Sequence, residues 1–187
     1  RCITKKIKAQ PSCPSSILLI IQFLILFSPF SPHCFKSIRN NWVTEPSQTL
    51  QFVEPITQIV YQAKWKDLVR IYNDESNSFI KETKLSYAAL YPTNFEKQKV
   101  QLACDVFNEK TVIALEKRNL NGTATFVRLV TRMWNMINIK SPHTGYRTND
   151  PDRQPFREKI DERLVFLSNV ATMLQLSTWS TRMQSYG

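Results

Sequence analysis

The chain has 187 residues, 42% of them hydrophobic, which is enough for one ordinary domain with a packed core. Its formal net charge is +10, but residues 1–40 hold six basic and no acidic residues, so the remainder is only mildly basic, which argues against a domain that coats a nucleic-acid duplex. Only 3 Gly against 11 Phe and 4 Trp argue against a glycine-rich phosphate loop and favour packed helices, and 4 widely spaced Cys with 2 His argue against structural zinc.

The first feature along the chain is an apolar run at residues 17–27, interrupted only by Gln22. Three interpretations stay open for it: a buried strand, translated non-coding sequence, or a signal peptide or membrane anchor. The run is shorter than the ~20 residues that a membrane span needs. We therefore assign no single role to residues 1–31. Because the sequence begins with Arg, we expect a fragment or an imperfect gene model.

Helical spacing of apolar residues begins at about residue 48. A first helix has one apolar face, formed by Trp65, Leu68, Val69 and Tyr72. The polar residues 73–78 are expected to end it. Thr93 and Glu96 have the spacing of a capping box, which predicts the start of a long helix that runs to about residue 118.

Two further helices are expected, one at 123–138 after Asn121-Gly122 and one that starts near Pro155. Between them, residues 140–156 contain three prolines and mixed charges, which predicts an unusually long loop. Loops of this length are either functional or mobile. Together the apolar stripes predict a mainly α-helical fold.

Residues 32–42 read Pro-His-Cys-Phe-Lys-Ser-Ile-Arg-Asn-Asn-Trp. This stretch resembles the Pro-His-x-x-Lys-x-x-Arg-Asn signature of P-element-type transposases, the THAP-domain transposase family. The resemblance implies a ribonuclease-H-like fold into which a mostly helical GTP-binding domain is inserted. It implies three parts here: residues 1–31 with a remnant ribonuclease-H-like strand, residues 32–47 with the signature and a linker, and residues 48–187 as a helical insertion-domain bundle.

Two later segments extend the resemblance. Residues 92–107 are similar to the family's Pro-x-x-Phe-x-Lys-Met-x-Val-x-Leu-Ala-x-x-Val-Phe segment, and residues 134–138 look like its Phe-Asp-x-x-Asn segment. By this resemblance, five residues match nucleotide-contact positions of the family: Lys84, Lys99, Val100 through its backbone, Asn135 and Asn138.

The residue types at these positions suit a nucleotide. Without a phosphate loop, a triphosphate needs side-chain cations, and Lys99 is expected in the first two turns of a capped helix, near the positive end of its dipole. Lys84 is expected to contact the triphosphate from the side opposite Lys99. Asn138 offers both a donor and an acceptor for a base edge or ribose. The family has an Asp where Asn135 stands, which implies weaker selectivity for guanine.

The carboxylates of metal-assisted transposition are missing from this sequence. In the family, two Asp and a Glu hold two divalent ions. Here Phe30 and Ser31 precede the Pro-His pair where an Asp is expected, and nothing resembles the family's Glu motif. The motifs of phosphate-loop, serine-hydrolase and zinc-protease sites are also absent from the sequence. We therefore expect no catalytic residue, no metal ligand and no enzymatic activity.

The expected function is that of a catalytically incomplete GTP-binding domain of a P-element-like DNA transposase, with GTP as an assembly cofactor for DNA binding. Basic residues expected to meet transposon-end DNA are Arg128, Arg132, Lys140, Arg147 and Arg153, together with Arg157, Lys159 and Arg163. The resemblance also leaves open a homo-oligomer, and it implies a nuclear location; membrane association is the alternative if residues 17–27 are an anchor. The rival function is that of a degenerate helical interaction module without nucleotide binding.

Overall fold

The computed structural model describes residues 31–44, 48–139, 141, 143–156, 161–176 and 178–179. Their elements are, in chain order, α2 (Ser31–Thr44), β1 (Thr49–Val53), β2 (Val60–Lys64), α3 (Trp65–Ser76), α4 (Tyr87–Leu90), the 3-10 turn η2 (Glu96–Gln98), α5 (Val100–Val106), α6 (Glu109–Lys117), α7 (Asn121–Ile137), α8 (Thr144–Arg147), the 3-10 turn η3 (Pro151–Arg153), α9 (Glu162–Leu176) and β3 (Thr178–Trp179). The mainly helical fold is thus confirmed. The apolar run at 17–27, with its expected strand or anchor, lies outside the described residues.

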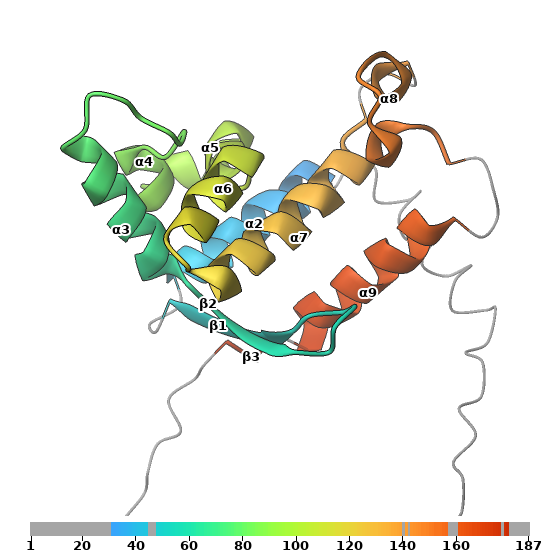
Figure 1. Cartoon of the computed structure of the whole chain (residues 1–187), viewed down its shortest axis with the longest axis horizontal. Coiled ribbons are helices and arrows are strands. Elements are labelled where there is room, and N and C mark those ends of the chain that lie inside the picture. The colour runs from blue at the N-terminus through green and yellow to red at the C-terminus, as the bar shows by residue number, and fades with distance from the viewer. Residues whose placement is uncertain are drawn as a thin grey trace, which may run out of the picture.

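Helices α2 and α7 form the centre of the molecule and run in opposite directions (Figure 1). Phe35, near the start of α2, stacks on Trp134, near the end of α7, with ring centroids 4.1 Å apart. Trp42, near the end of α2, meets Phe126 in the first half of α7 at 4.9 Å. Helices α3 to α6 lie on one side of this pair, and α8 and α9 lie on the other.

The core is rich in aromatic rings. Trp42 contacts Trp65 edge to face at 5.1 Å, and Phe107 lies 5.3 Å from Phe35. All four rings are at most 2% exposed. Helix α2 therefore belongs to the same core as the elements after residue 48, so the expected boundary at residue 47 does not coincide with a gap in the packing.

Residues 49–64 form an antiparallel hairpin, so the helical pattern expected from residue 48 is wrong for this stretch. Leu50 pairs with Ala63, and both are fully buried. Side chains of β1 alternate between buried and exposed, which is the period of a strand that covers a core with one face. Strand β3 pairs with the other edge of β1, giving the order β2-β1-β3.

Glu54 closes this hairpin. Its Oε2 accepts hydrogen bonds from the Ile56 amide (3.1 Å) and the Thr57 hydroxyl (2.6 Å). Burial works against ionisation of this carboxyl, but the bonds from Thr57 and Ile56 outweigh it and hold the Glu54 pKa below its usual value. The side chain thus replaces backbone partners that the turn lacks.

The long helix expected over 93–118 is three separate elements. The capping box is real: the Thr93 amide donates to Glu96 Oε2 (2.9 Å), and the Glu96 amide donates to Thr93 Oγ1 (3.3 Å). It opens only the turn η2, however. Asn108 is extended (φ −153°) and caps a new helix by accepting from the Thr111 amide (3.1 Å), which separates α5 from α6.

Other helix boundaries also differ from the expected ones. Helix α3 runs through most of the polar stretch 73–78 and ends at Ser76. Helix α7 begins at Asn121, two residues early, and α9 begins at Glu162 and not near Pro155. The loop expected over 140–156 contains α8 and η3.

The start of α7 is pressed against the outer edge of β2. A methyl carbon added at Gly122 would lie 2.3 Å from the Gln62 carbonyl oxygen, so only glycine permits this approach. The Lys64 amide, also on that edge, donates to the Thr123 hydroxyl (3.0 Å), which in turn bonds to Asp67. The helix thus gives the Lys64 amide a hydrogen-bond partner and covers the Gln62 carbonyl at an edge that would otherwise be open.

Candidate functional site

The signature on α2 holds the turn that precedes α5. Arg39 Nη2 donates to the carbonyls of Lys97 (3.1 Å) and Glu96 (3.3 Å), and Asn40 Nδ2 donates to the same Lys97 carbonyl (3.1 Å). Lys36 Nζ reaches Gln98 Oε1 at 3.4 Å. The Lys, Arg and Asn of the signature therefore all bind turn η2, and the spacing of these residues along α2 serves to fix that turn.

Arg39 is fully buried, which is unusual for a cation. Desolvation lowers the pKa of its guanidinium, while the nearby Glu96 carboxylate raises it. Its Nε and Nη1 are buried without a partner in the described part of the chain. Arg39 therefore has a structural role at η2 and is not exposed to a ligand.

Lys99 and Val100 mark the start of α5. Lys99 is the residue before the helix, with extended backbone, and Val100 is its first residue. Lys99 therefore does not lie in the first two turns of a capped helix, as the sequence suggested; η2 intervenes. Its side chain is exposed, and its Nζ lies 5.2 Å from the centroid of the Phe95 ring.

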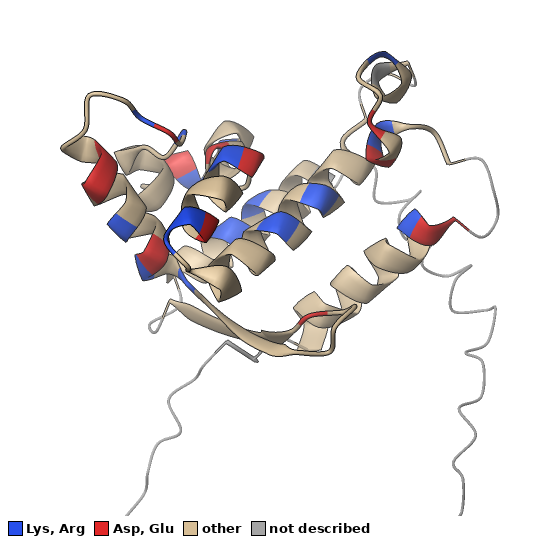
Figure 2. Cartoon of the chain, viewed as in Figure 1, with Lys and Arg blue, Asp and Glu red and all other residues tan. Residues whose placement is uncertain are grey.

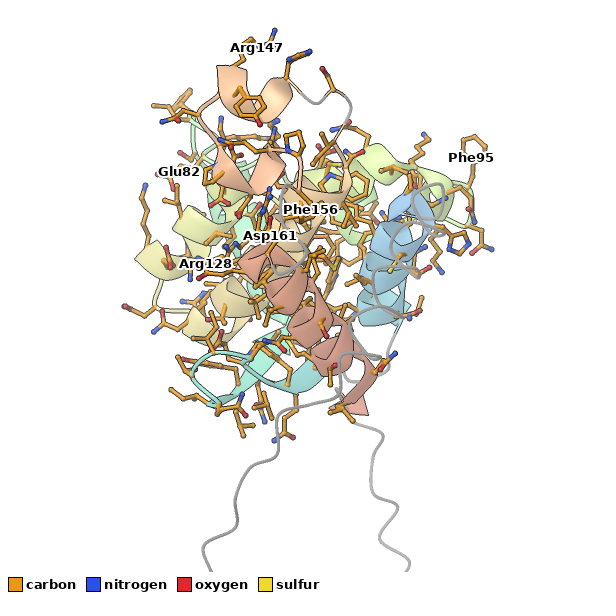
Figure 3. The ribbon with its side chains drawn as sticks, turned by 90° about the vertical axis from the view of Figure 1, so that its right-hand side faces the viewer. Glu82, Phe95, Arg128, Arg147, Phe156 and Asp161 are labelled. Carbon is orange, nitrogen blue, oxygen red and sulfur yellow. The ribbon has the colours of Figure 1, made fainter. Side chains whose placement is uncertain are left out.

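Lys84 lies on the connection between α3 and α4, and its side chain is exposed. The neighbouring Thr83 is buried and bonds through its hydroxyl to Glu75 (2.7 Å). Within the described ranges, no hydrogen bond or ion pair joins Lys84 to another of the five predicted site residues. Figure 3 shows Glu82 and Phe95, the labelled neighbours of Lys84 and Lys99, on opposite sides of the molecule.

Asn135 and Asn138 lie one helical turn apart at the end of α7. Asn135 is half-buried, and its Oδ1 accepts a hydrogen bond from Arg153 Nη2 at 2.8 Å. Asn138 is the residue after the helix, and its backbone amide donates to the Trp134 carbonyl (2.9 Å). The acceptor of Asn135 is therefore already engaged, whereas the Asn138 side chain has no such contact among the described residues.

The structure thus brings the predicted residues together in two groups, Lys99 with Val100 and Asn135 with Asn138, which α2 connects. Neither group contributes to the wall of the groove described next. A groove of about 430 Å³ lies elsewhere, between the hairpin and α9, where Phe52 and Met173 form part of its wall. In the described ranges, no three His, Cys, Asp or Glu side chains gather into a metal-binding group.

Most of the arginines expected to meet DNA are engaged within the protein. Arg132 binds Asp152 with two bonds (2.9 and 3.2 Å) and stacks over Phe166 at 4.4 Å. Arg153 pairs with Asp150 (3.1 Å), and Arg128 pairs with Glu116.

Arg163 is held most tightly. It binds Asp161, donates to the carbonyls of Pro151, Gln154 and Pro155, and lies over the Phe156 ring at 4.5 Å. Figure 2 shows acidic and basic residues next to each other at α8, η3 and the start of α9. Lys140, Arg157 and Lys159 lie outside the described residues, and Arg147 is exposed.

Sequence reasoning missed the exposed aromatic rings beside the lysines. Tyr87, Tyr91 and Phe95 are 66%, 46% and 75% exposed. The signal was available, since three rings recur at intervals of four residues between Lys84 and Lys99. It was hidden because aromatic residues at helical spacing are usually core residues.

Comparisons with known proteins add no relative. No family model matches the chain, and neither the curated proteins nor the solved structures contain a significant match. In the described part of the chain, no helix combines the length and the hydrophobicity that crossing a membrane requires.

Proposed function

We propose that the chain is a helical GTP-binding insertion domain of a P-element-like transposase, without catalytic activity of its own. The observation that supports this proposal is the packing of the three segments that carry the resemblance. The signature on α2 bonds to residues 96–98 of the second segment, and Phe35 stacks on Trp134 of the third. Segments that resemble one family in sequence therefore meet in space.

In this proposal the nucleotide lies between the start of α5 and the end of α7. Lys99 offers an exposed cation for phosphate, and the Asn138 side chain offers a donor and an acceptor for the base or ribose. Asn135 contributes its Nδ2, because Arg153 occupies its oxygen. Lys84 joins the site only if the connection before α4 moves toward α5.

The remaining parts of the proposal follow from the family resemblance. GTP serves as an assembly cofactor that prepares the protein for transposon-end DNA, in the nucleus, and residues 1–31 hold a remnant of the ribonuclease-H-like strand. Of the arginines expected to contact DNA, Arg147 is the one whose exposed side chain lacks an ion pair in the described residues. Arg132 and Arg153 would have to exchange an internal carboxylate for a phosphate.

Calorimetric titration of the full chain with GTP, with ATP as the comparison ligand, tests the proposal. The whole chain is needed because α2 contributes Phe35 and Trp42 to the core. We expect selective GTP binding, weakened at least about tenfold in the double variant K84A/K99A, which loses charged bonds to phosphate, and in N138A, which loses neutral hydrogen bonds to the base or ribose. The matched control is K110A, which removes an exposed lysine on α6.

The rival function is a helical interaction module that has kept the packing without the ligand. The bond between Arg153 and Asn135 favours it, because that bond gives Asn135 a structural partner. A folded chain that binds neither GTP nor ATP would support the rival and remove all five site assignments.

A further inference from the structure

Three aromatic rings project from one short surface segment, which we call the aromatic–lysine segment (residues 84–99). Tyr87 and Tyr91 lie together, with ring centroids 5.0 Å apart, and Phe95 follows four residues later. Exposed aromatic rings on a protein surface often mark a binding site, and here two of the three rings contact each other. Figure 3 shows Phe95 projecting at the edge of the molecule, away from Arg128.

The rings are exposed because the opposite side of the segment is anchored. Ala89 and Leu90 of α4 are fully buried, and the Leu90 carbonyl accepts a hydrogen bond from Trp65 Nε1 (3.3 Å). Ser86 caps α4 by accepting from the Ala89 amide (3.2 Å). Since α4 is fixed in this way, Tyr87 and Tyr91 cannot turn inward without breaking the core contacts of the helix.

Lysines flank these rings, with Lys84 before them in the chain and Lys97 and Lys99 after them. Lys84 and Lys99 are exposed, Lys97 is half-exposed, and none of them forms an ion pair with an acidic side chain in the described residues. The one carboxylate inside the segment, Glu96, is held by the amide and hydroxyl of Thr93. These bonds, more than the charge of Lys99, hold the Glu96 pKa below its usual value.

We propose that the aromatic–lysine segment binds single-stranded nucleic acid along its length, with unpaired bases stacked on Tyr87, Tyr91 and Phe95. Phosphates are held by Lys97 and Lys99 at one end of the segment and by Lys84 at the other, so the strand follows the surface across the molecule. Stacking platforms flanked by cations are the common way to bind a single strand without reading its sequence. This proposal shares Lys84 and Lys99 with the proposed GTP site but does not rest on it, since the three rings carry it and Asn135 and Asn138 have no part in it.

The arrangement favours a single strand over the other anionic partners. In a duplex the base faces are covered by their neighbours, so exposed rings would gain nothing there. A lone nucleotide has one base, whereas the segment offers rings at three positions along the chain. A membrane surface would be met by aliphatic side chains as well, yet within the segment the exposed large apolar residues are all aromatic.

The test is fluorescence anisotropy of a labelled oligothymidylate of about 12 nucleotides, a length within the usual site size, titrated with the full chain. A duplex of equal length and anionic phosphatidylserine vesicles are the comparison partners. We expect the single strand to bind more tightly than the duplex, with an affinity that falls as salt rises. Y87A, Y91A and F95A should each weaken binding about fivefold or more, whereas F95Y should keep it.

The matched control is Y146A, which removes a tyrosine on α8 that is 44% exposed and adjacent to Arg147. It should leave oligothymidylate binding unchanged. Circular dichroism confirms that each variant is folded, and ring variants that bind like the unmodified chain overturn the proposal. So do equal affinities for duplex and single strand, or binding to vesicles alone.

The outcome is separable from that of the GTP titration. If GTP binds and N138A weakens only GTP, Asn138 belongs to the GTP site alone and the proposal stands with its ring variants. If the ring variants weaken GTP while the oligothymidylate does not bind, the rings belong to a mononucleotide site and the proposal is overturned. Oligothymidylate binding without GTP binding supports it and removes the proposed GTP function.

Discussion

The molecule has two cation-rich regions that use their charge in opposite ways. In the arginine network, formed by Arg132, Arg153 and Arg163, each guanidinium pairs with a carboxylate. In the aromatic–lysine segment, the lysines have no ion pair among the described residues and flank the exposed rings in the chain. Counts of basic residues do not distinguish these regions. What distinguishes them is whether the protein itself already supplies the anion.

The difference follows the chemistry of the two side chains. A guanidinium presents several donors in a plane, so Arg163 can satisfy a carboxylate and three carbonyls at once. A lysine carries its charge on a flexible, strongly hydrated end and gives little by pairing at a surface. The arginines therefore hold the chain between η3 and α9, and the lysines stay available to a ligand.

The largest expected effect is a loss of stability from a substitution in the core that both regions share. Trp42 is fully buried between Trp65 and Phe126, and its Nε1 donates to the Gln48 carbonyl (3.3 Å). W42A should lower the free energy of unfolding by about 3–5 kcal/mol, because it leaves a large cavity in the shared core. Urea unfolding measures this change. A loss below about 1 kcal/mol would mean that α2 is not part of the core.

The next largest effect is a loss of stability that concerns the arginine network alone. R163A should cost about 2–3 kcal/mol in the free energy of unfolding, because it removes the guanidinium that bonds to Asp161 and to three carbonyls, and leaves the Asp161 carboxylate only the backbone amide of residue 163 as a partner among the described residues. Both charged side chains of this pair are about 15% exposed or less. R147A, at an exposed arginine of the same region, is the control and should change stability by less than about 0.5 kcal/mol. Equal effects of the two variants would contradict a structural role for the network.

Lowering the pH should remove a smaller part of the stabilisation that the arginine network provides. The hydrogen bond from Arg163 is the main reason that the Asp161 pKa lies below its usual value. The stabilisation is therefore fully present above the ordinary aspartate pKa of about 3.9 and is lost as the pH falls through the lowered value. Urea unfolding between pH 5 and pH 2 should show a larger loss of stability in the unmodified chain than in D161N.

The smallest stability effect belongs to the aromatic–lysine segment. K99A should change the free energy of unfolding by less than about 0.5 kcal/mol, since the side chain is exposed and lies over the face of the exposed Phe95 ring. The same variant should weaken binding of the labelled oligothymidylate. Thermal unfolding and anisotropy on one sample make the comparison. A clear loss of stability with unchanged binding would reverse the assignment of the two regions.

The sequence predicted α7 from one long and regular apolar face. It predicted α9 as a helix but placed its start near Pro155, about seven residues before Glu162. It did not predict the hairpin, because the alternation of buried residues at Leu50 and Phe52 is too short to be told from the start of a helical pattern. Asn108 is an N-cap that looks like any polar residue within a helix until its backbone is seen. Periodicity along the chain cannot show such breaks.

The candidate site was predicted only in part for a related reason. Lys99 and Asn138 are on the surface as expected, but the partners of Asn135 and Arg132 lie 18 and 20 residues away in the sequence. Whether a polar side chain is free depends on such distant neighbours, and no local pattern records them. The exposed rings of Tyr87 and Tyr91 were missed because exposure also depends on the fold.

Gly122 has a consequence for how separate copies of the chain behave. By allowing α7 to rest on the Gln62 carbonyl, it keeps the outer edge of β2 closed to strands from other molecules. A larger residue would push the helix off that edge and expose an open strand next to Val60 and Ile59, which are already about half exposed. The first sign of such a change would be concentration-dependent self-association at a temperature where the fold itself persists. Glycine at position 122 therefore protects the chain against association through this strand edge.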